Sequence, residues 1–139
     1  MAHSALGHYT HEKSPVGCAA ALATLAVIEE EHLVERAREL GAYALERLRG
    51  LAQRHALIGE VRGLGLLLGL ELVRRRGATA EPAREEAERV LYEALARGLS
   101  FKVTMGHILT LTPALTITRE QLDRAVEILD ASLAAVCQP

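Results

Sequence analysis

Aromatic residues are scarce in this chain, at 3% of 139 residues with no tryptophan, so a core must be built from leucine, alanine and valine. Cysteine is scarce too, because Cys18 and Cys137 stand alone near opposite ends, without the spacing of metal ligands. Two isolated thiols favour a reducing compartment over a disulfide framework. The net charge of -2 gives no broad electrostatic attraction for nucleic acid. We therefore expect no nucleic-acid partner and no metal.

The apolar run within residues 59–72 is too short to cross a bilayer, which takes about 20 apolar residues. The first 13 residues lack the apolar centre of a signal peptide. We therefore expect a cytoplasmic protein without a membrane partner. Residues 8–13 form a polar stretch that leads directly into a helix, and we expect them to continue a larger fold. The length is otherwise that of one domain.

The segment 59–72, GEVRGLGLLLGLEL, carries three glycines in an apolar run: Gly63, Gly65 and Gly69. Glycine costs a helix interior about 1 kcal/mol relative to alanine, which argues against a buried helix. Two strands joined by a glycine turn, or one bent strand with a bulge, fit the pattern better. A dinucleotide fingerprint would need a third glycine where Leu68 stands, followed by a helix, and the sequence offers neither. The glycines therefore indicate a tight turn and close backbone packing.

Four helices are predicted from apolar periodicity and end signals. Ser14 and Pro15 start the first, over 15–30, which is apolar on most sides and so should pack against a large neighbour. The second covers 33–54. The third opens at Glu81-Pro82 and ends at Gly98, and the last follows a capping box of Thr118 and Gln121. The predicted core stripes are Leu33, Ala37, Leu40, Ala44, Leu48 and Leu51; Ala87, Val90, Leu91, Ala94 and Leu95; and Leu122, Val126, Leu129, Leu133 and Val136.

Strands are predicted over 99–103 and 108–113, the second because Leu109 and Leu111 alternate with Thr110 and Thr112. Residues 74–77, three arginines and a glycine, are predicted to form a loop. Helices and strands then follow in the order α-α-β-β-α-β-β-α. This order predicts an α+β domain with a small sheet covered on one face by helices.

Other polar features carry weak functional signals. His8 and His11 with Glu12 lack a further metal ligand at a sensible spacing, which is typical of a solvated loop. The arginines in 74–76 could hold a phosphate or an acidic partner, but such a cluster is usually a solubilising edge. No nucleophile signature is present. The residues by themselves thus predict a globular α+β domain without assigned chemistry.

Three segments together resemble one enzyme family. Residues 9–22, YTHEKSPVGCAAAL, resemble the part of class-III, pyridoxal-phosphate-dependent aminotransferases where a threonine precedes a proline and an alanine-rich run. Residues 59–72 resemble that family's glycine-rich Val-Arg-Gly signature, and residues 111–117, LTPALTI, resemble its late Pro-Pro-Leu turn. The resemblance implies the small C-terminal domain of a fold-type-I transferase, with a mainly antiparallel sheet. Residues 1–32 would end the large domain, and 33–139 would form the small α+β domain.

The resemblance also implies chemistry that this chain lacks. Family members hold pyridoxal phosphate as a Schiff base on a lysine, with an aspartate at the pyridinium nitrogen, and both precede the segment matched here. The chain has two lysines, Lys13 and Lys102, and neither occupies that place. We therefore expect no catalytic residue in this chain and no activity from it alone. The family threonine that reaches the cofactor phosphate of the partner subunit corresponds to Thr10, which implies a homodimer.

Substrate binding is expected to depart from the family. Many relatives carry an arginine before the late proline turn, where it grips a substrate carboxylate, and Thr110 stands at that position. Either carboxylate binding moves elsewhere, with Lys102 as a candidate substitute, or the substrate lacks an α-carboxylate. The implied reaction transfers an amino group between an amine or amino acid and a keto acid. A lyase or decarboxylase of the same family, or a free-standing oligomerisation or binding module, are the alternatives.

Overall fold

A computed structural model describes residues 14–75 and 80–137, and it divides into two compact units, Met1–Val34 and Glu35–Pro139. The described part of the first unit is mainly the helix α1, Pro15–Glu30, with the bounds predicted from the sequence. Ser14 is its N-cap with an extended backbone, and Pro15 takes the first helical position, although the Ser14 side chain makes no capping hydrogen bond. No residue of α1 is buried, and Val16 and Leu22 are 80% and 68% exposed. The helix therefore presents its apolar side chains without cover.

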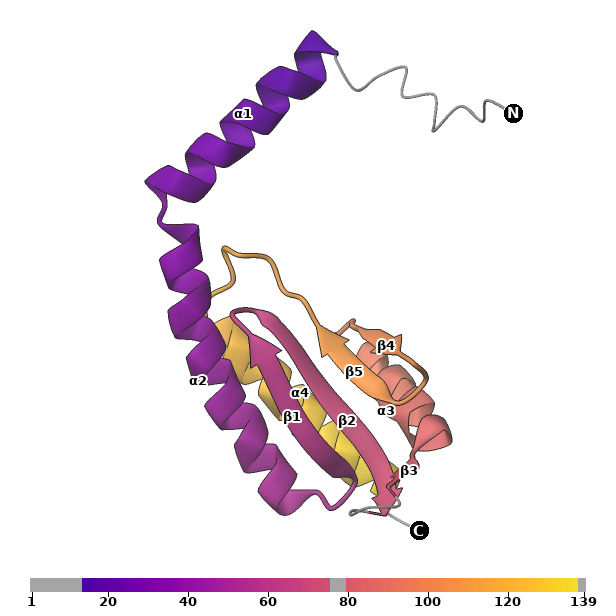
Figure 1. Ribbon diagram of the computed structural model, residues 1–139. Coiled ribbons are helices and arrows are strands. Elements are labelled where there is room, and N and C mark those ends of the chain that lie inside the picture. Colours follow the sequence, from indigo (N-terminus) through magenta and orange to yellow (C-terminus); the bar gives the residue numbers. More distant parts are fainter. Residues whose placement is uncertain (1–13, 76–79, 138–139) are drawn as a thin grey trace, which may run out of the picture. The chain divides into compact units, whose positions relative to one another are not determined.

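The second unit combines three helices with an antiparallel sheet (Figure 1). The strands lie in the order β1-β2-β5-β4, and β3 pairs with β2 off this path. The elements are α2 (Leu33–Arg54), β1 (Ile58–Leu64), β2 (Leu67–Arg75), β3 (Glu81–Pro82), α3 (Arg84–Ala96), β4 (Lys102–Thr104), β5 (Ile108–Leu111) and α4 (Arg119–Cys137). All strand pairs are antiparallel. The predicted α+β class with a small antiparallel sheet is confirmed.

The glycine-rich segment forms a hairpin. Leu64 pairs with Leu67, so only Gly65 and Leu66 make the turn, and Gly65 adopts a φ of 55°. A positive φ at the first of two turn residues is the pattern of a type II′ turn, which favours glycine there. A register shift between Ile58 and Glu60 adds a bulge near the start of β1. Of the two alternatives, two strands joined by a glycine turn is correct.

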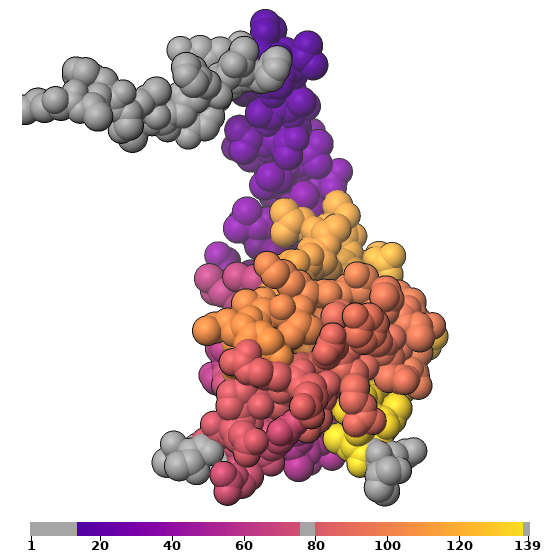
Figure 2. Space-filling model, turned by 90° about the vertical axis from the view of Figure 1, so that its right-hand side faces the viewer, coloured from indigo at the N-terminus to yellow at the C-terminus, as the bar shows by residue number. Residues whose placement is uncertain are grey.

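One face of the sheet and the three helices enclose a single apolar cluster. The predicted stripe of α4 is buried in full, and α2 buries Ala44, Leu48 and Leu51. Polar contacts also join α2 to α4, since Asp130 accepts from Arg54 at 2.6 Å and lies 2.5 Å from His55 Nε2. Figure 2 shows α3 and the β4–β5 segment adjoining on one face of this unit. The opposite face of the sheet carries the polar residues described below.

Helix ends follow their local signals where such signals exist. The Thr118 amide donates to Gln121 Oε1 at 2.9 Å, and the Gln121 amide donates to Thr118 Oγ1 at 3.2 Å, which confirms the capping box. Gly98 has a φ of 92° just after α3, the backbone expected of a glycine that ends a helix. Within α3, Ala87, Val90 and Ala94 are buried. Leu95 is 53% exposed, so its predicted place in the core is wrong.

Several predicted boundaries are wrong around β3. Arg74 and Arg75 continue β2 instead of forming a loop, because Arg75 pairs with Glu81 and Val73 pairs with Pro82. Glu81-Pro82 is therefore a two-residue strand, and α3 begins at Arg84.

Two later strands also differ from their predicted bounds. The strand predicted over 99–103 lies at 102–104, and the one predicted over 108–113 ends at Leu111. Each difference arises where pairing with another strand decides the conformation.

Candidate functional site

A row of four residues crosses the outer face of the sheet. Arg62 pairs with Gly69, Gly69 pairs with Thr110, and Thr110 pairs with Lys102. Directly paired residues of antiparallel strands project to the same face. Their strand neighbours Leu68, Leu70 and Leu109 are buried, so the row lies on the face away from the core. The two candidate substrate residues, Thr110 and Lys102, are thus neighbours, although they are eight positions apart in sequence.

A hollow of about 280 Å³ lies over three residues of this row, Arg62, Gly69 and Thr110. Gly69 provides part of its floor: a Cβ added there would meet Ile108 Cγ2 at 3.6 Å and nothing else closer than 3.9 Å. The absence of a side chain at Gly69 leaves open space between the side chains on the neighbouring strands. The residues that line the hollow are Arg62, Gly63, Leu64, Leu67, Leu68, Gly69, Ile108 and Thr110. Its walls are mostly apolar, with one guanidinium and one hydroxyl group.

Thr110 shares a hydrogen bond with a second hydroxyl. Its Oγ1 lies 2.8 Å from Thr104 Oγ1, and either atom can be the donor. Each hydroxyl group has one hydrogen and two acceptor lone pairs. When Thr104 donates to Thr110, the Thr110 hydrogen is available for a ligand. The pair can therefore present a donor at the edge of the hollow.

Arg62 is held by two carboxylates. Its Nη1 donates to Glu60 Oε2 and Glu71 Oε2, both at 2.7 Å. The hydrogen bond to Glu71 raises the pKa of Arg62 further, and the same bond holds the pKa of Glu71 below its usual value despite partial burial. Buried His107 places Nε2 3.5 Å from Glu71 Oε1. Arg62 and Glu71 therefore stay ionised at neutral pH, and both contacts to Arg62 use the same nitrogen.

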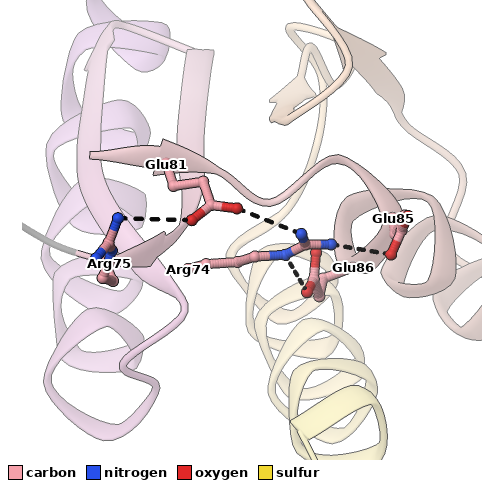
Figure 3. A network of polar contacts seen from close by, with 5 residues as sticks. All are labelled: Arg74, Arg75, Glu81, Glu85 and Glu86. Carbon is pink, nitrogen blue, oxygen red and sulfur yellow. Dashed lines mark hydrogen bonds and ion pairs between the residues drawn. The ribbon is translucent and has the colours of Figure 1, made fainter. Parts of the chain in front are cut away.

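The arginine cluster at the end of β2 is internally compensated (Figure 3). Arg74 donates to Glu86 at 2.8 Å and to Glu85 at 2.9 Å, and it also reaches Glu81 at 3.4 Å. These carboxylates raise the pKa of Arg74, with the Glu86 hydrogen bond as the largest cause. Arg75 lies 4.0 Å from Glu81. The described arginines of this cluster are thus engaged with glutamates from β3 and the first turn of α3, which favours the surface-edge interpretation.

Some predicted features lie outside the described residues: Thr10, and the histidine pair His8 and His11 with Glu12. Within residues 14–75 and 80–137, no group of three His, Cys, Asp or Glu side chains is placed to hold a metal ion. In the same ranges, no helix combines the length and the apolar character needed to cross a membrane.

Comparison with known proteins assigns the chain to a family. A match to the family described as Aminotransferase class-III covers residues 3–133. The chain is 47% identical to (R)-1-hydroxy-2-aminoethylphosphonate ammonia-lyase of Vibrio splendidus over 99% of this chain and 28% of that protein. It is 46% identical to isoleucine 2-epimerase of Lentilactobacillus buchneri over 92% of this chain and 28% of that protein.

Solved structures agree with the sequence matches. An amine transaminase from an uncultivated Pseudomonas species, in its PLP-bound form, superposes with a TM-score of 0.86 at 38% identity, covering 96% of this chain and 30% of that one. The chain thus spans less than a third of the length of these relatives. The family match, the sequence relatives and the shared fold lead to one conclusion: this chain belongs to the class-III aminotransferase family.

Proposed function

We propose that this chain is the C-terminal part of a pyridoxal-phosphate-dependent class-III aminotransferase, which transfers an amino group between an amine or amino acid and a keto acid. The observation that carries the proposal is the family match over residues 3–133, combined with coverage of only about 28% of the first two sequence relatives. The remainder of such an enzyme would supply a large domain. A homodimer is part of the proposal.

In this proposal the chain is inactive alone because the Schiff-base lysine lies in the large domain. Lys102 is the only lysine among the described residues, and it is exposed on β4 beside Thr110. A site for the cofactor also needs a carboxylate for the ring nitrogen. The carboxylates on the outer face, Glu60 and Glu71, are already engaged with Arg62. The described residues therefore do not form a complete site for pyridoxal phosphate. This supports the proposal that residues outside them would bind the cofactor.

The proposed division of the chain follows the resemblance. Residues 1–32 would end the large domain, with Thr10 contacting the cofactor phosphate of the partner subunit, and 33–139 would form the small domain. The uncovered apolar side chains of α1 support this division, because exposed apolar surface of this kind usually marks an interface. Thr110 and Lys102 would contact the substrate from the outer face of the sheet.

The test mixes the purified chain with pyridoxal phosphate and records the absorbance spectrum, with an amine and a keto acid added afterwards. The expected result is no stoichiometric lysine-bound cofactor and no transfer. Lys102→Ala is the matched control for adventitious attachment to a surface lysine. A stoichiometric shift of the cofactor's absorbance band, together with turnover, would contradict the proposed inactivity if replacing one of the two lysines abolished both. Restoring the family's large domain in front of residue 1 should restore cofactor binding.

A second candidate is a lyase of the same family. It is favoured by the 47% identity to an ammonia-lyase across 99% of this chain. Thr110 is consistent with it, because threonine lacks the guanidinium fork that binds an α-carboxylate. A full-length enzyme carrying this segment distinguishes the two reactions by its products. Release of ammonia when no keto acid has been added supports the lyase. Consumption of an added keto acid, with formation of an equal amount of its aminated product, supports the transferase.

A further inference from the structure

We propose that the hollow over Gly69 binds an oxyanionic end group of the substrate, a carboxylate or a phosphonate, with Arg62 and Thr110 as the donors from its two walls. This inference rests on the proposed function, because it places Thr110 at the substrate. It answers where anion binding goes when threonine stands at residue 110. The positively charged group is then Arg62 on β1, which lies in the same row as Thr110 on β5, on the other side of Gly69.

Spacing across the sheet supports a small ligand. Neighbouring strands lie about 4.8 Å apart, so Arg62 on β1 and Thr110 on β5 flank Gly69 at roughly 10 Å from each other. That gap would be filled if residue 69 carried a large side chain. With glycine there, the hollow of about 280 Å³ admits a group of a few heavy atoms. The two donors then approach it from opposite sides.

Arg62 keeps donors available. Both of its carboxylate contacts use Nη1, and no described residue accepts a hydrogen bond from Nε or Nη2. These two nitrogens form one edge of the planar guanidinium, the edge that can bind two oxygens of a carboxylate or phosphonate at once. Glu60 and Glu71 hold the side chain by its other end. The geometry is that of an anchored arginine, with its orientation set by the sheet.

Charge balance predicts how the ligand would be held. Arg62 and Lys102 on this face are matched by Glu60 and Glu71, so the local formal charge is near zero. Neither glutamate lines the hollow. Binding would therefore depend on directed hydrogen bonds more than on a broad positive field. We expect modest affinity for small probes and only a weak dependence on ionic strength.

The experiment titrates the isotopically labelled chain with acetate and with methylphosphonate, in a zwitterionic buffer at constant ionic strength, while amide and Arg62 Nε resonances are recorded. Methylammonium serves as the probe of opposite charge. Saturable shifts centred on Gly69, Thr110 and Arg62 are expected for at least one anion and for no cation. Stronger binding of acetate would identify a carboxylate end group, and stronger binding of methylphosphonate would identify a phosphonate.

Three variants make the result specific. Gly69→Leu should abolish binding by filling the hollow, and Arg62→Lys should weaken it about tenfold, because the charge remains but the two-donor edge is lost. Gly50→Ala is the matched control, since a Cβ there meets nothing within 4 Å and lies on α2. Shifts spread over the surface without saturation, or binding retained in a folded Gly69→Leu variant, would overturn the proposal. The absorbance test above measures lysine-bound cofactor and turnover, whereas this titration measures binding of a small probe at the hollow, so failure of the proposed function is read separately.

Discussion

Gly41 and Gly50 lie in the same helix, α2, and replacing each by alanine should change stability in opposite directions. A Cβ at Gly50 would meet nothing within 4 Å. A Cβ at Gly41 would lie 2.1 Å from the carbonyl oxygen of Gly65, and 2.4 and 2.7 Å from its C and Cα atoms. These contacts are with the backbone of the β1–β2 turn. That turn cannot shift freely, because Leu64 and Leu67 pair on either side of its two residues.

The expected magnitudes follow from two opposing effects. Alanine favours a helix interior by about 1 kcal/mol over glycine, and this gain applies to both positions. At Gly41 the helix must also retreat by about 1.3 Å, from 2.1 Å to an ordinary contact of 3.4 Å. Overpacking of this kind costs about 3 kcal/mol at the upper end of its usual range. Gly50→Ala should therefore stabilise by about 1 kcal/mol, and Gly41→Ala should destabilise by about 2 kcal/mol.

Urea unfolding followed by circular dichroism measures both free energies of unfolding, with equal slopes expected because the exposed surface is unchanged. In thermal unfolding the two variants should differ by on the order of 10 °C or more. A Gly41→Ala variant as stable as Gly50→Ala would refute the close packing of α2 on the hairpin turn. Reduced stability of both variants would instead refute the open surroundings of Gly50.

Three further predictions concern the β4–β5 turn, the partly buried carboxylate of Asp130 and the hollow over Gly69. Met105 has a φ of 53° in the β4–β5 turn, so Met105→Gly should raise the free energy of unfolding by about 1 kcal/mol in urea titration, and a loss would contradict the strain. Partial burial acts to raise the pKa of Asp130, but hydrogen bonds from His55 and Arg54 outweigh it and hold that pKa below its ordinary value. This stabilisation is present above the ordinary pKa of an aspartate and is lost as the pH falls through the lower folded-state pKa. Asp130→Asn should therefore flatten the acid limb of a thermal-unfolding profile. Thr110→Arg should strengthen acetate binding about tenfold in the titration described above, and unchanged affinity would remove residue 110 from the site.

Local chemistry explains the elements that were predicted correctly. Pro15 can occupy only the first turn of a helix, and the Thr118–Gln121 capping box satisfies helix donors within four residues. Gly98 ends α3 with a backbone that other residues adopt at a cost. Each of these signals acts between residues that are close in sequence. They set the start of α1, the end of α3 and the start of α4.

The wrong predictions share a different cause. Arg74 and Arg75 read as a polar loop, yet they belong to β2 because Glu81 and Pro82 pair with that strand. Leu95 matches the periodicity of α3, but the helix turns that residue away from the core. Periodicity identifies a face of a helix without specifying where the neighbour ends.

The candidate site was predicted in part. Thr110 and Lys102 were identified by resemblance, and their direct pairing is a property of the sheet. Arg62 and Gly69 were missed, although the turn contained the necessary signal. A two-residue turn at Gly65-Leu66 makes residues 64 and 67 partners, and counting back pairs Arg62 with Gly69. Thr10 lies outside the described residues, so its role stays a prediction.

The sequence by itself determined the family, the start of α1 and the capping box of α4, because motifs and caps depend on neighbours along the chain. For the glycine-rich segment it left a hairpin and a bent strand as alternatives. Only the tertiary structure decided that Arg62, Gly69, Thr110 and Lys102 form one row. The first three of them line the hollow. Strand register is the reason, since a shift of one residue would turn each of these side chains to the other face. The same holds for Gly41, whose missing side chain lets α2 pack on the turn of a hairpin that follows it in the chain.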